Sequence, residues 1–245
     1  MFKKEIRELW KTKKVITFLS VALAVALISP MIAYNMPDLI NQMNIGTKIK
    51  LPEPTVVDAY LHFFKNMSSL VLLAMIVLFS TSIPDEKNKG TLKMVLTNQV
   101  SIKNVVFAKI TAQIVVATLV YLVSIASFLL YTVLLFKTVQ VPHPVLSFVS
   151  FYGYVLFTIV IINCIGTLSQ KGTTAIILSI IVFLILAMTS MIPQVGQYVP
   201  NYLLTASSHL VNGMKNLTSW YWSLGITGIL TVIIAIVSTQ TKKFY

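Results

Sequence analysis

Six long apolar runs, separated by shorter polar segments, dominate the pattern of hydrophobic and polar positions along the 245-residue chain. A helix needs roughly 20 apolar residues to cross the hydrocarbon core of a bilayer. The runs are continuous, whereas the strands of a membrane barrel alternate between apolar and polar positions. We therefore predict transmembrane helices at Val15–Met36, Asn66–Ile83, Val105–Phe136, Ser147–Leu168, Thr174–Ile192 and Ser219–Ser238. The third run is longer than a span requires, so we expect it to tilt or to project from the bilayer.

The composition agrees with an all-α, polytopic membrane protein. The chain is 56% hydrophobic and 11% charged, whereas soluble domains carry about 25% charged residues. The centres of the six runs contain no Asp, Glu, Lys, Arg or His. Each such residue at a span centre would cost about 2.5–3.5 kcal/mol on the insertion scale. Residues 1–245 therefore form one membrane-embedded domain.

The basic residues predict the orientation and explain the net charge of +12. With both termini in the cytoplasm, 14 of the 19 Lys and Arg residues fall on the inner side, as the positive-inside rule requires. The charge is thus a topology signal and does not indicate nucleic acid as a partner. The outer side holds Lys48, Lys50, Lys65, Lys137 and Lys215.

The N-terminal segment, residues 1–14, has the pattern of an amphipathic helix. Its apolar residues Phe2, Ile6, Leu9 and Trp10 recur at helical spacing among lysines. We expect this helix to lie in the inner interface, although a basic flank that only orients the first span is the alternative. Trp10 would then lie at headgroup level, and Trp220 and Trp222 would form a second aromatic belt at the start of the last span. The outer loop 193–218 is apolar in its middle and is expected to form short helices.

A charged loop, residues 84–104, separates the second and third spans. Pro84 is expected to end the second span, and the acidic residues after it suit the start of a short helix. Gly90 permits a sharp turn. A small apolar stripe follows, which either rests on the membrane or docks into a groove of a partner. The stripe consists of Leu92, Val95 and Leu96.

The order of residues in this loop resembles that of the type-2 permeases of ABC transporters, the ABC-2 family. The shared features are an acidic residue, a "GTL", an apolar turn, a "VS" and two basic residues. Here these are Glu86, Gly90-Thr91-Leu92, Val95-Leu96, Val100-Ser101, Lys103 and Lys109. The chain departs from the family pattern at Lys93, where an acidic residue is common, and at Gln99, where a proline is common.

The resemblance implies a fold, partners and a mechanism. Two permease subunits, identical or different, would pair in the membrane, with residues 1–14 as the interfacial elbow helix. Two separate ABC ATP-binding subunits would dock on the coupling helix in residues 84–104, and they would hold ATP and Mg²⁺, so this chain would bind no cofactor. The docking residues would be Glu86, Gly90, Thr91, Leu92, Lys93, Val95 and Leu96. The chain is also similar to bacterial exporter permeases for bacteriocins, lantibiotics and phenol-soluble modulins, which implies a bacterial plasma membrane and a peptide or drug substrate.

The sequence gives no sign of an enzyme. It has no phosphate-binding glycine loop, no carboxylate pair within a span, and no Cys/His cluster with metal spacing. An ion-coupled transporter would place an ionisable residue within the membrane, and the centres of the runs offer only neutral polar groups. Asn163 and Thr167 are the candidates for a substrate pathway, with hydrogen bonding between helices as their alternative role. Two more classes of protein compete with a transporter: a channel, and a membrane immunity or sensor protein that binds a peptide without transporting it.

Overall fold

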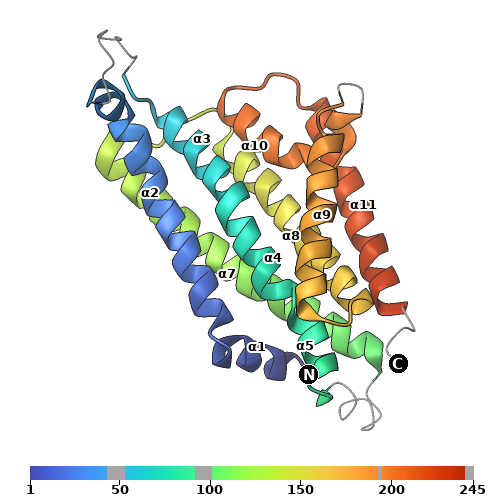
Figure 1. The fold of residues 1–245 in the computed structure, drawn as a ribbon. Helices are drawn as coiled ribbons and strands as arrows, with labels where there is room; N and C mark the ends of the chain where they lie inside the picture. The colour runs from blue at the N-terminus through green and yellow to red at the C-terminus, as the bar shows by residue number, and fades with distance from the viewer. Residues whose placement is uncertain (43–52, 92–100, 193–194, 241–245) are drawn as a thin grey trace.

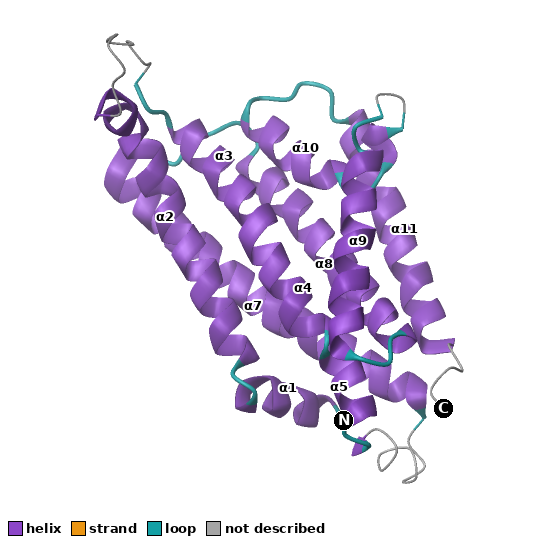
Figure 2. Cartoon of the chain, in the orientation of Figure 1, coloured by secondary structure: helices purple, strands orange, loops and turns teal. Residues whose placement is uncertain are grey.

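The chain folds as a bundle of long helices in a computed structural model that describes residues 1–42, 53–91, 101–192 and 195–240 (Figure 1). These ranges contain helices and loops but no strand (Figure 2). The first half comprises α1 (Phe2–Lys11), α2 (Lys14–Gln42), α3 (Val56–Asn66), the π-helical turn η1 (Met67–Val71), α4 (Leu72–Ser80) and α5 (Ser82–Asn88). The second half comprises α7 (Ile102–Phe136), α8 (Pro144–Leu168), α9 (Gly172–Thr189), the 3₁₀ turn η2 (Gly196–Tyr198), α10 (Tyr202–Val211) and α11 (Thr218–Gln240).

Six of the described helical stretches are long and apolar enough to cross a membrane, which confirms the predicted all-α polytopic fold. They are Lys14–Pro37, Val56–Asn88, Ile102–Phe136, Pro144–Leu168, Gly172–Thr189 and Thr218–Thr239. Figure 1 shows that α11 ends at the same end of the bundle as α1, as an even number of crossings requires. We refer to this end as the α1 end.

The second span begins well before the predicted Asn66, so that boundary was wrong. Thr55 caps α3 through a reciprocal pair of hydrogen bonds with Asp58, which fixes the helix start. The prediction began at Asn66 because three polar residues interrupt the apolar sequence before it. These residues recur at i, i+4 and i+7 and therefore share one helical face. They are Asp58, His62 and Lys65. The opposite face of α3 is buried.

Pro84 does not end the second span, which corrects a second prediction. The break lies at Thr81, between α4 and α5, and Pro84 is buried within the first turn of α5. A proline is tolerated there because the first N–H groups of a helix have no acceptor within it. The sharp turn predicted at Gly90 is present, since its φ angle is +69°.

The bundle is organised around α8, which packs against α4, α5, α7, α9, α10 and α11. On one side, α2 packs along α7 and α3. A cluster of aromatic rings fills the core at the end away from α1; for example, the rings of Phe63 and Phe128 stack with centroids 4.3 Å apart. The loop after α9 forms the short helix α10, as predicted, and its buried face packs on α8 and α3.

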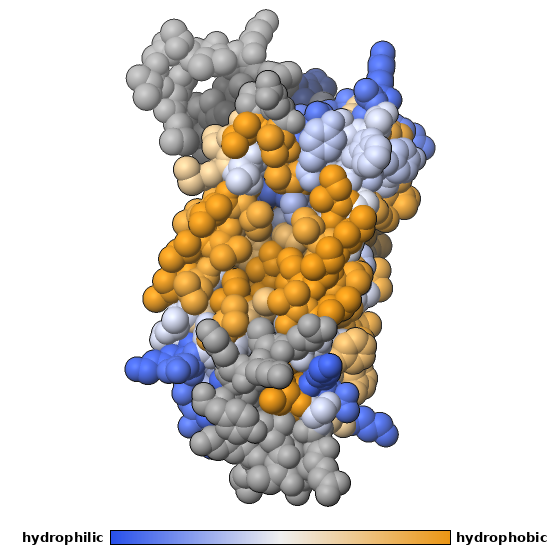
Figure 3. All heavy atoms as spheres, turned by 90° about the vertical axis from the view of Figure 1, so that its right-hand side faces the viewer, coloured by the Kyte–Doolittle hydropathy of each residue, from blue (hydrophilic) through white to orange (hydrophobic). Residues whose placement is uncertain are grey.

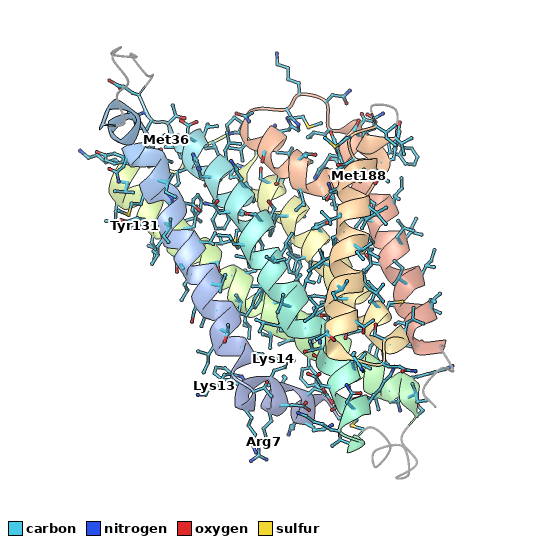
Figure 4. The ribbon with its side chains drawn as sticks, viewed as in Figure 1. Arg7, Lys13, Lys14, Met36, Tyr131 and Met188 are labelled. Carbon is cyan, nitrogen blue, oxygen red and sulfur yellow. The ribbon has the colours of Figure 1, made fainter. Side chains whose placement is uncertain are left out.

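The surface has the distribution expected of a membrane protein. Figure 3 shows an apolar band across the middle of one face, with hydrophilic side chains toward both ends. Arg7 and Lys13 are exposed at the α1 end, where Arg7 points away from the bundle (Figure 4). Trp10 and Trp222 are exposed, which agrees with positions at the membrane interface. Trp220 is only 4% exposed, so its assignment to the aromatic belt was wrong: it faces the core and its ring packs edge-on against Tyr221.

Candidate functional site: a charged cluster at the α1 end

Three helices bring five charged side chains together at the α1 end of the bundle. The amphipathic helix α1 contributes three of them, α5 one and α7 one. We call this group the charged cluster, and it consists of Lys4, Glu5, Glu8, Glu86 and Lys109. The three helices are separated in sequence, so only the tertiary fold brings their charged groups together.

Lys109 lies at the centre of the cluster. Its Nζ donates to Glu5 Oε2 at 2.6 Å and lies 3.2 Å from Glu86 Oε1. Lys4 Nζ reaches the same Glu86 oxygen at 2.9 Å and lies 3.9 Å from Glu8 Oε2. The lysines thus tie α1 and α7 to the single carboxylate that α5 supplies.

The core of the cluster is excluded from water. The side chains of Glu5 and Glu86 are each 5% exposed and that of Lys109 is 2% exposed, whereas Lys4 and Glu8 are open on one side. Glu5 Oε1 and Glu86 Oε2 are buried and accept no hydrogen bond from the described residues. Removing one partner of a buried pair typically costs about 3–5 kcal/mol, because a charge is left uncompensated. The three helices are therefore strongly interdependent here.

Local sequence explains why these groups face inward. Glu5 and Leu9 are four residues apart on α1 and form its buried face, whereas Phe2 and Trp10 are exposed. This differs from the predicted apolar face, which had placed all four apolar residues together. Ser101 caps α7 by accepting a hydrogen bond from the backbone N–H of Asn104. The helix start is therefore fixed two turns before Lys109.

The cluster shifts the pKa values of the two side chains on its open side. Burial alone would lower the pKa of Lys4, but its hydrogen bond to Glu86 and the charges of Glu86, Glu5 and Glu8 outweigh burial and raise it. Burial raises the pKa of Glu8, and repulsion from Glu86 and Glu5 adds to that effect although Lys109 opposes it. Lys4 is therefore held in its charged form.

A chain of neutral polar groups continues from the cluster into the bundle. Gln113, one helical turn beyond Lys109, donates from Nε2 to Ser82 Oγ at 3.2 Å. Its Oε1 accepts from Asn163 Nδ2 at 2.6 Å. Beside them is a cavity of about 50 Å³, lined among others by Glu5, Lys109 and Gln113. The chain joins α5, α7 and α8 by hydrogen bonds in an otherwise apolar interior.

The short helix α5 is held on its other sides as well. Lys87 donates to the backbone carbonyls of Thr167 and Ser169, which lie at the C-terminus of α8 where carbonyls lack helical partners. A Cβ on Gly172, at the start of α9, would lie 2.9 Å from Asp85 Oδ1. Three successive residues of α5 therefore face three different neighbours: Asp85 faces α9, Glu86 faces the charged cluster and Lys87 faces α8.

The charged cluster is poorly suited to a metal ion. Carboxylate oxygens of Glu5, Glu8 and Glu86 lie within 4.8 Å of one another. However, the ammonium groups of Lys4 and Lys109 already occupy the space between them at 2.6–3.9 Å. The arrangement therefore serves to hold helices together and offers no vacant coordination sphere.

The structure places the predicted docking residues in different surroundings. Glu86 is directed inward, so it does not offer its carboxylate to a partner in this conformation. Gly90 follows α5, and Thr91 is exposed with its hydroxyl donating to the backbone carbonyl of Glu86. Docking by the remaining residues stays a prediction, because these lie outside the described residues. They are Leu92, Lys93, Val95 and Leu96.

The two candidate pathway residues are buried among helices. Asn163 is 1% exposed and also donates to the backbone carbonyl of Ile159, while Thr167 donates to the carbonyl of Cys164. These contacts agree with the alternative role of hydrogen bonding within the bundle, and a role in a substrate path stays a prediction. Sequence reasoning missed Glu5 as the partner of Lys109. The signal was present, since Glu5 is one of only seven acidic residues in the chain and lies among lysines.

Comparison with known proteins gives two matches. A family model described as "ABC-2 family transporter protein" matches residues 6–190, a range that includes the whole charged loop and five complete spans. The chain is also similar to the "Uncharacterized transmembrane protein YxlG" of Bacillus subtilis (strain 168), with 19% identity over 258 residues. That alignment covers 100% of this chain and 96% of the relative.

Proposed function

The chain belongs to the ABC-2 family of transporter proteins. We propose that it couples ATP hydrolysis in a separate subunit to the export of a substrate, and that the charged cluster transmits the movement of that subunit to the spans. The family is a membrane transporter component and not a catalytic family, and it implies an ABC ATP-binding partner. The chain is a multi-pass membrane protein, consistent with a bacterial plasma membrane. Family membership favours a transporter over an immunity or sensor protein.

The observation that carries the proposal is the position of the cluster beside the charged loop. Glu86 precedes residues 92–100 of that loop, and Lys109 follows them, two turns into α7. The Glu86–Lys109 contact at 3.2 Å therefore links the helices on both sides of the loop. A force applied to the loop would move α5 and the start of α7 together, and Lys4 and Glu5 would carry α1 with them.

This linkage suits rigid-body switching between states of a transporter. Buried charged pairs break at a high cost, so the linked helices move as a unit. The polar chain through Gln113 to Asn163 and the contacts of Lys87 extend the linkage to α8. In this proposal two ATP-binding subunits act on two permease subunits, and the substrate is an amphipathic or apolar peptide or drug, in keeping with the apolar spans.

The first experiment identifies the partner. The chain is extracted from its host in a mild detergent, and the proteins that co-purify are identified by mass spectrometry. We expect an ABC-type ATP-binding protein at a ratio of one to one. A second, different permease in the complex would identify a heterodimer. Recovery of the chain without any ATP-binding protein would contradict the proposal.

The second experiment tests the role of the cluster in that complex. Glu86→Gln is compared with Glu8→Gln, which changes a more exposed carboxylate of the same cluster. The readouts are binding of the ATP-binding subunit, ATP hydrolysis, and ATP-driven uptake of a fluorescent amphipathic peptide into inside-out proteoliposomes. We expect Glu86→Gln to retain binding but to lower uptake per ATP hydrolysed, whereas Glu8→Gln resembles the wild type. Equal behaviour of the two variants would show that the cluster does not couple.

A further inference from the structure

The amphipathic helix α1 carries a row of cations along one side. Lys3, Arg7 and Lys11 recur at i, i+4 and i+8, so they lie in line on one face of the helix over about 12 Å. All three are exposed. Within the described part of the chain, none of them is ion-paired. We call these three residues the basic ridge.

The charged cluster fixes the direction of the basic ridge. Glu5 belongs to the buried face of α1, and Lys109 holds its carboxylate at 2.6 Å. Glu8 is turned toward the cluster as well, where its carboxylate lies 3.9 Å from Lys4 Nζ. Both acidic residues of α1 are therefore used within the bundle. The opposite face keeps a positive charge that no described residue neutralises, and Figure 4 shows Arg7 pointing away from the bundle.

Two large aromatic side chains accompany the basic ridge. Phe2 is 40% exposed and Trp10 is 53% exposed. Trp10 follows Arg7 by three residues and therefore lies on the same side of the helix. Aromatic residues at a membrane–water interface lie at headgroup level, and helices that combine them with Lys and Arg bind anionic membranes. The exposed face of α1 therefore fits a lipid surface better than bulk water.

The helix α1 lies at the level expected of lipid headgroups. It crosses the end of the bundle (Figure 1), and the turn after it leads through Lys13 directly into the first span, which begins at Lys14. Lys13 is exposed at this corner (Figure 4). On the face drawn in Figure 3, hydrophilic side chains border the apolar band toward both ends. The phosphate groups of the leaflet at the α1 end are therefore within reach of the long side chains of the ridge.

Two other occupants fit the basic ridge less well. A second copy of the chain that packed ridge against ridge would bring like charges together, which opposes binding. An acidic surface of a soluble subunit would match the charge of the ridge. However, Trp10 lies one turn before the start of the first span, at a depth where lipid headgroups surround the bundle. Charge and position together favour anionic lipid.

We propose that the basic ridge binds the phosphate groups of anionic phospholipids in the leaflet at the α1 end, with Phe2 and Trp10 packed among the headgroups. Arg7, in the middle of the ridge, suits a phosphate because a guanidinium can donate two parallel hydrogen bonds to it. Lys4 and Glu5 of the same helix belong to the charged cluster, so bound lipid steadies α5 and α7 through α1. The binding requires no partner subunit, so its test is separate from those of the proposed function.

The test is photolabelling of the full chain in nanodiscs made of equal amounts of phosphatidylglycerol and phosphatidylcholine. A diazirine next to the phosphate is carried by the first lipid in one sample and by the second lipid in the other. Adducts on residues 1–13 are then quantified by mass spectrometry. One cation near an anionic surface contributes about five-fold to binding, so we expect the ridge to favour phosphatidylglycerol about ten-fold or more at low salt. Equal labelling by the two lipids would show that the ridge is only solvated and would overturn the proposal.

Salt and two triple variants control the test. The preference should fall toward one at about 1 M salt, where charges are screened beyond about 3 Å. Replacing the three ridge residues by glutamine should also bring the preference to one. The ridge side chains form no ion pair with the described residues, so thermal unfolding of this variant in detergent should match that of the wild type. The matched control removes three exposed cations at the same end but outside α1, and it should keep the preference: Lys89→Gln, Lys103→Gln and Lys171→Gln. Equal loss in both variants would assign the effect to the general charge of this end and not to the ridge.

Co-purification distinguishes lipid from a protein partner. The ridge variant should lose its lipid preference and still retain the ATP-binding subunit that we expect to purify with the wild type. Loss of that subunit, together with equal labelling of the wild type by the two lipids, would assign the ridge to protein docking and overturn the proposal. If the wild type purifies without an ATP-binding subunit, the proposed function fails, but a lipid preference that depends on the ridge still supports the lipid site.

Discussion

Lys109 Nζ lies 2.6 Å from Glu5 Oε2, although the two residues are 104 positions apart and belong to different helices. Both side chains are buried, and Glu86 shares the same ammonium group. The contact fixes the amphipathic N-terminal helix to the start of the third span. Lys109→Met should therefore cost about 3–5 kcal/mol of stability, because it leaves two carboxylates buried without a counter-charge. Thermal unfolding of the detergent-solubilised protein measures the loss.

A double-mutant cycle separates this pair from general damage to the fold. Glu5→Gln is combined with Lys109→Met, and the double variant should lose less than the sum of the single losses. Additive losses would show that the two side chains do not interact. Lys103→Met provides a control, since Lys103 is exposed on the first turn of the same helix.

The polar chain inside the bundle should behave as a unit. Asn163→Leu leaves Gln113 Oε1 without its donor, which should cost about 1–2 kcal/mol. The variant Asn163→Leu/Gln113→Leu should recover part of that loss, because both partners are then apolar. Thermal unfolding again provides the measurement. If Asn163 lines a substrate path, peptide uptake in proteoliposomes should fall further than the loss of stability explains.

The pH dependence of stability should carry the signature of Lys4. The pKa of Lys4 is raised in the folded protein. The contribution of Lys4 to the stability of the fold is therefore fully present below the pKa of lysine in the unfolded chain, which is about 10.4. That contribution is lost as the pH rises through the raised folded pKa. The difference in melting temperature between wild type and Lys4→Met should stay constant from neutral pH and shrink above about pH 10.4. A difference that instead shrinks on acidification from neutral pH would assign the effect to the carboxylates.

We expect the end of α5 to require glycine at position 90, because the backbone there has a positive φ angle. Its φ angle is +69°, and a Cβ added there would meet no atom within 4 Å. Gly90→Ala should therefore cost about 1–2 kcal/mol through backbone strain alone. The expected readout is weaker binding of the ATP-binding subunit with normal insertion into the membrane. Gly225→Ala is the matched control, since it also has open space but lies in α11 with no positive φ angle.

The apolar stripe in the charged loop should anchor the partner subunit. Leu92→Asp introduces a charge into the predicted docking surface, so it should leave the chain in the membrane but prevent co-purification of the ATP-binding subunit. Lys93→Asp restores the acidic residue that is common in the family at this position. It should change binding less than Leu92→Asp does. Normal binding and export by Leu92→Asp would refute the predicted docking helix.

The sequence alone determined the class of the protein and most of its architecture. Six runs of apolar residues can satisfy their backbone in lipid only as helices, so the existence of the spans followed from hydropathy. The predicted start of the second span at Asn66 was wrong because a hydropathy pattern treats Asp58, His62 and Lys65 as interruptions. A helix places these three residues on one face, so it can continue through them. The predicted interfacial position of Trp220 was wrong because an aromatic residue near a span end is compatible with both the interface and the core. In the fold this side chain is buried against the bundle.

Only the tertiary structure decided how the charges are used. The sequence assigned Glu86 and Lys109 to the cytoplasmic loop and its border, and it suggested no role for Glu5. Their ion pairs depend on how α1 crosses the bundle and on the rotation of α7, which no local pattern specifies.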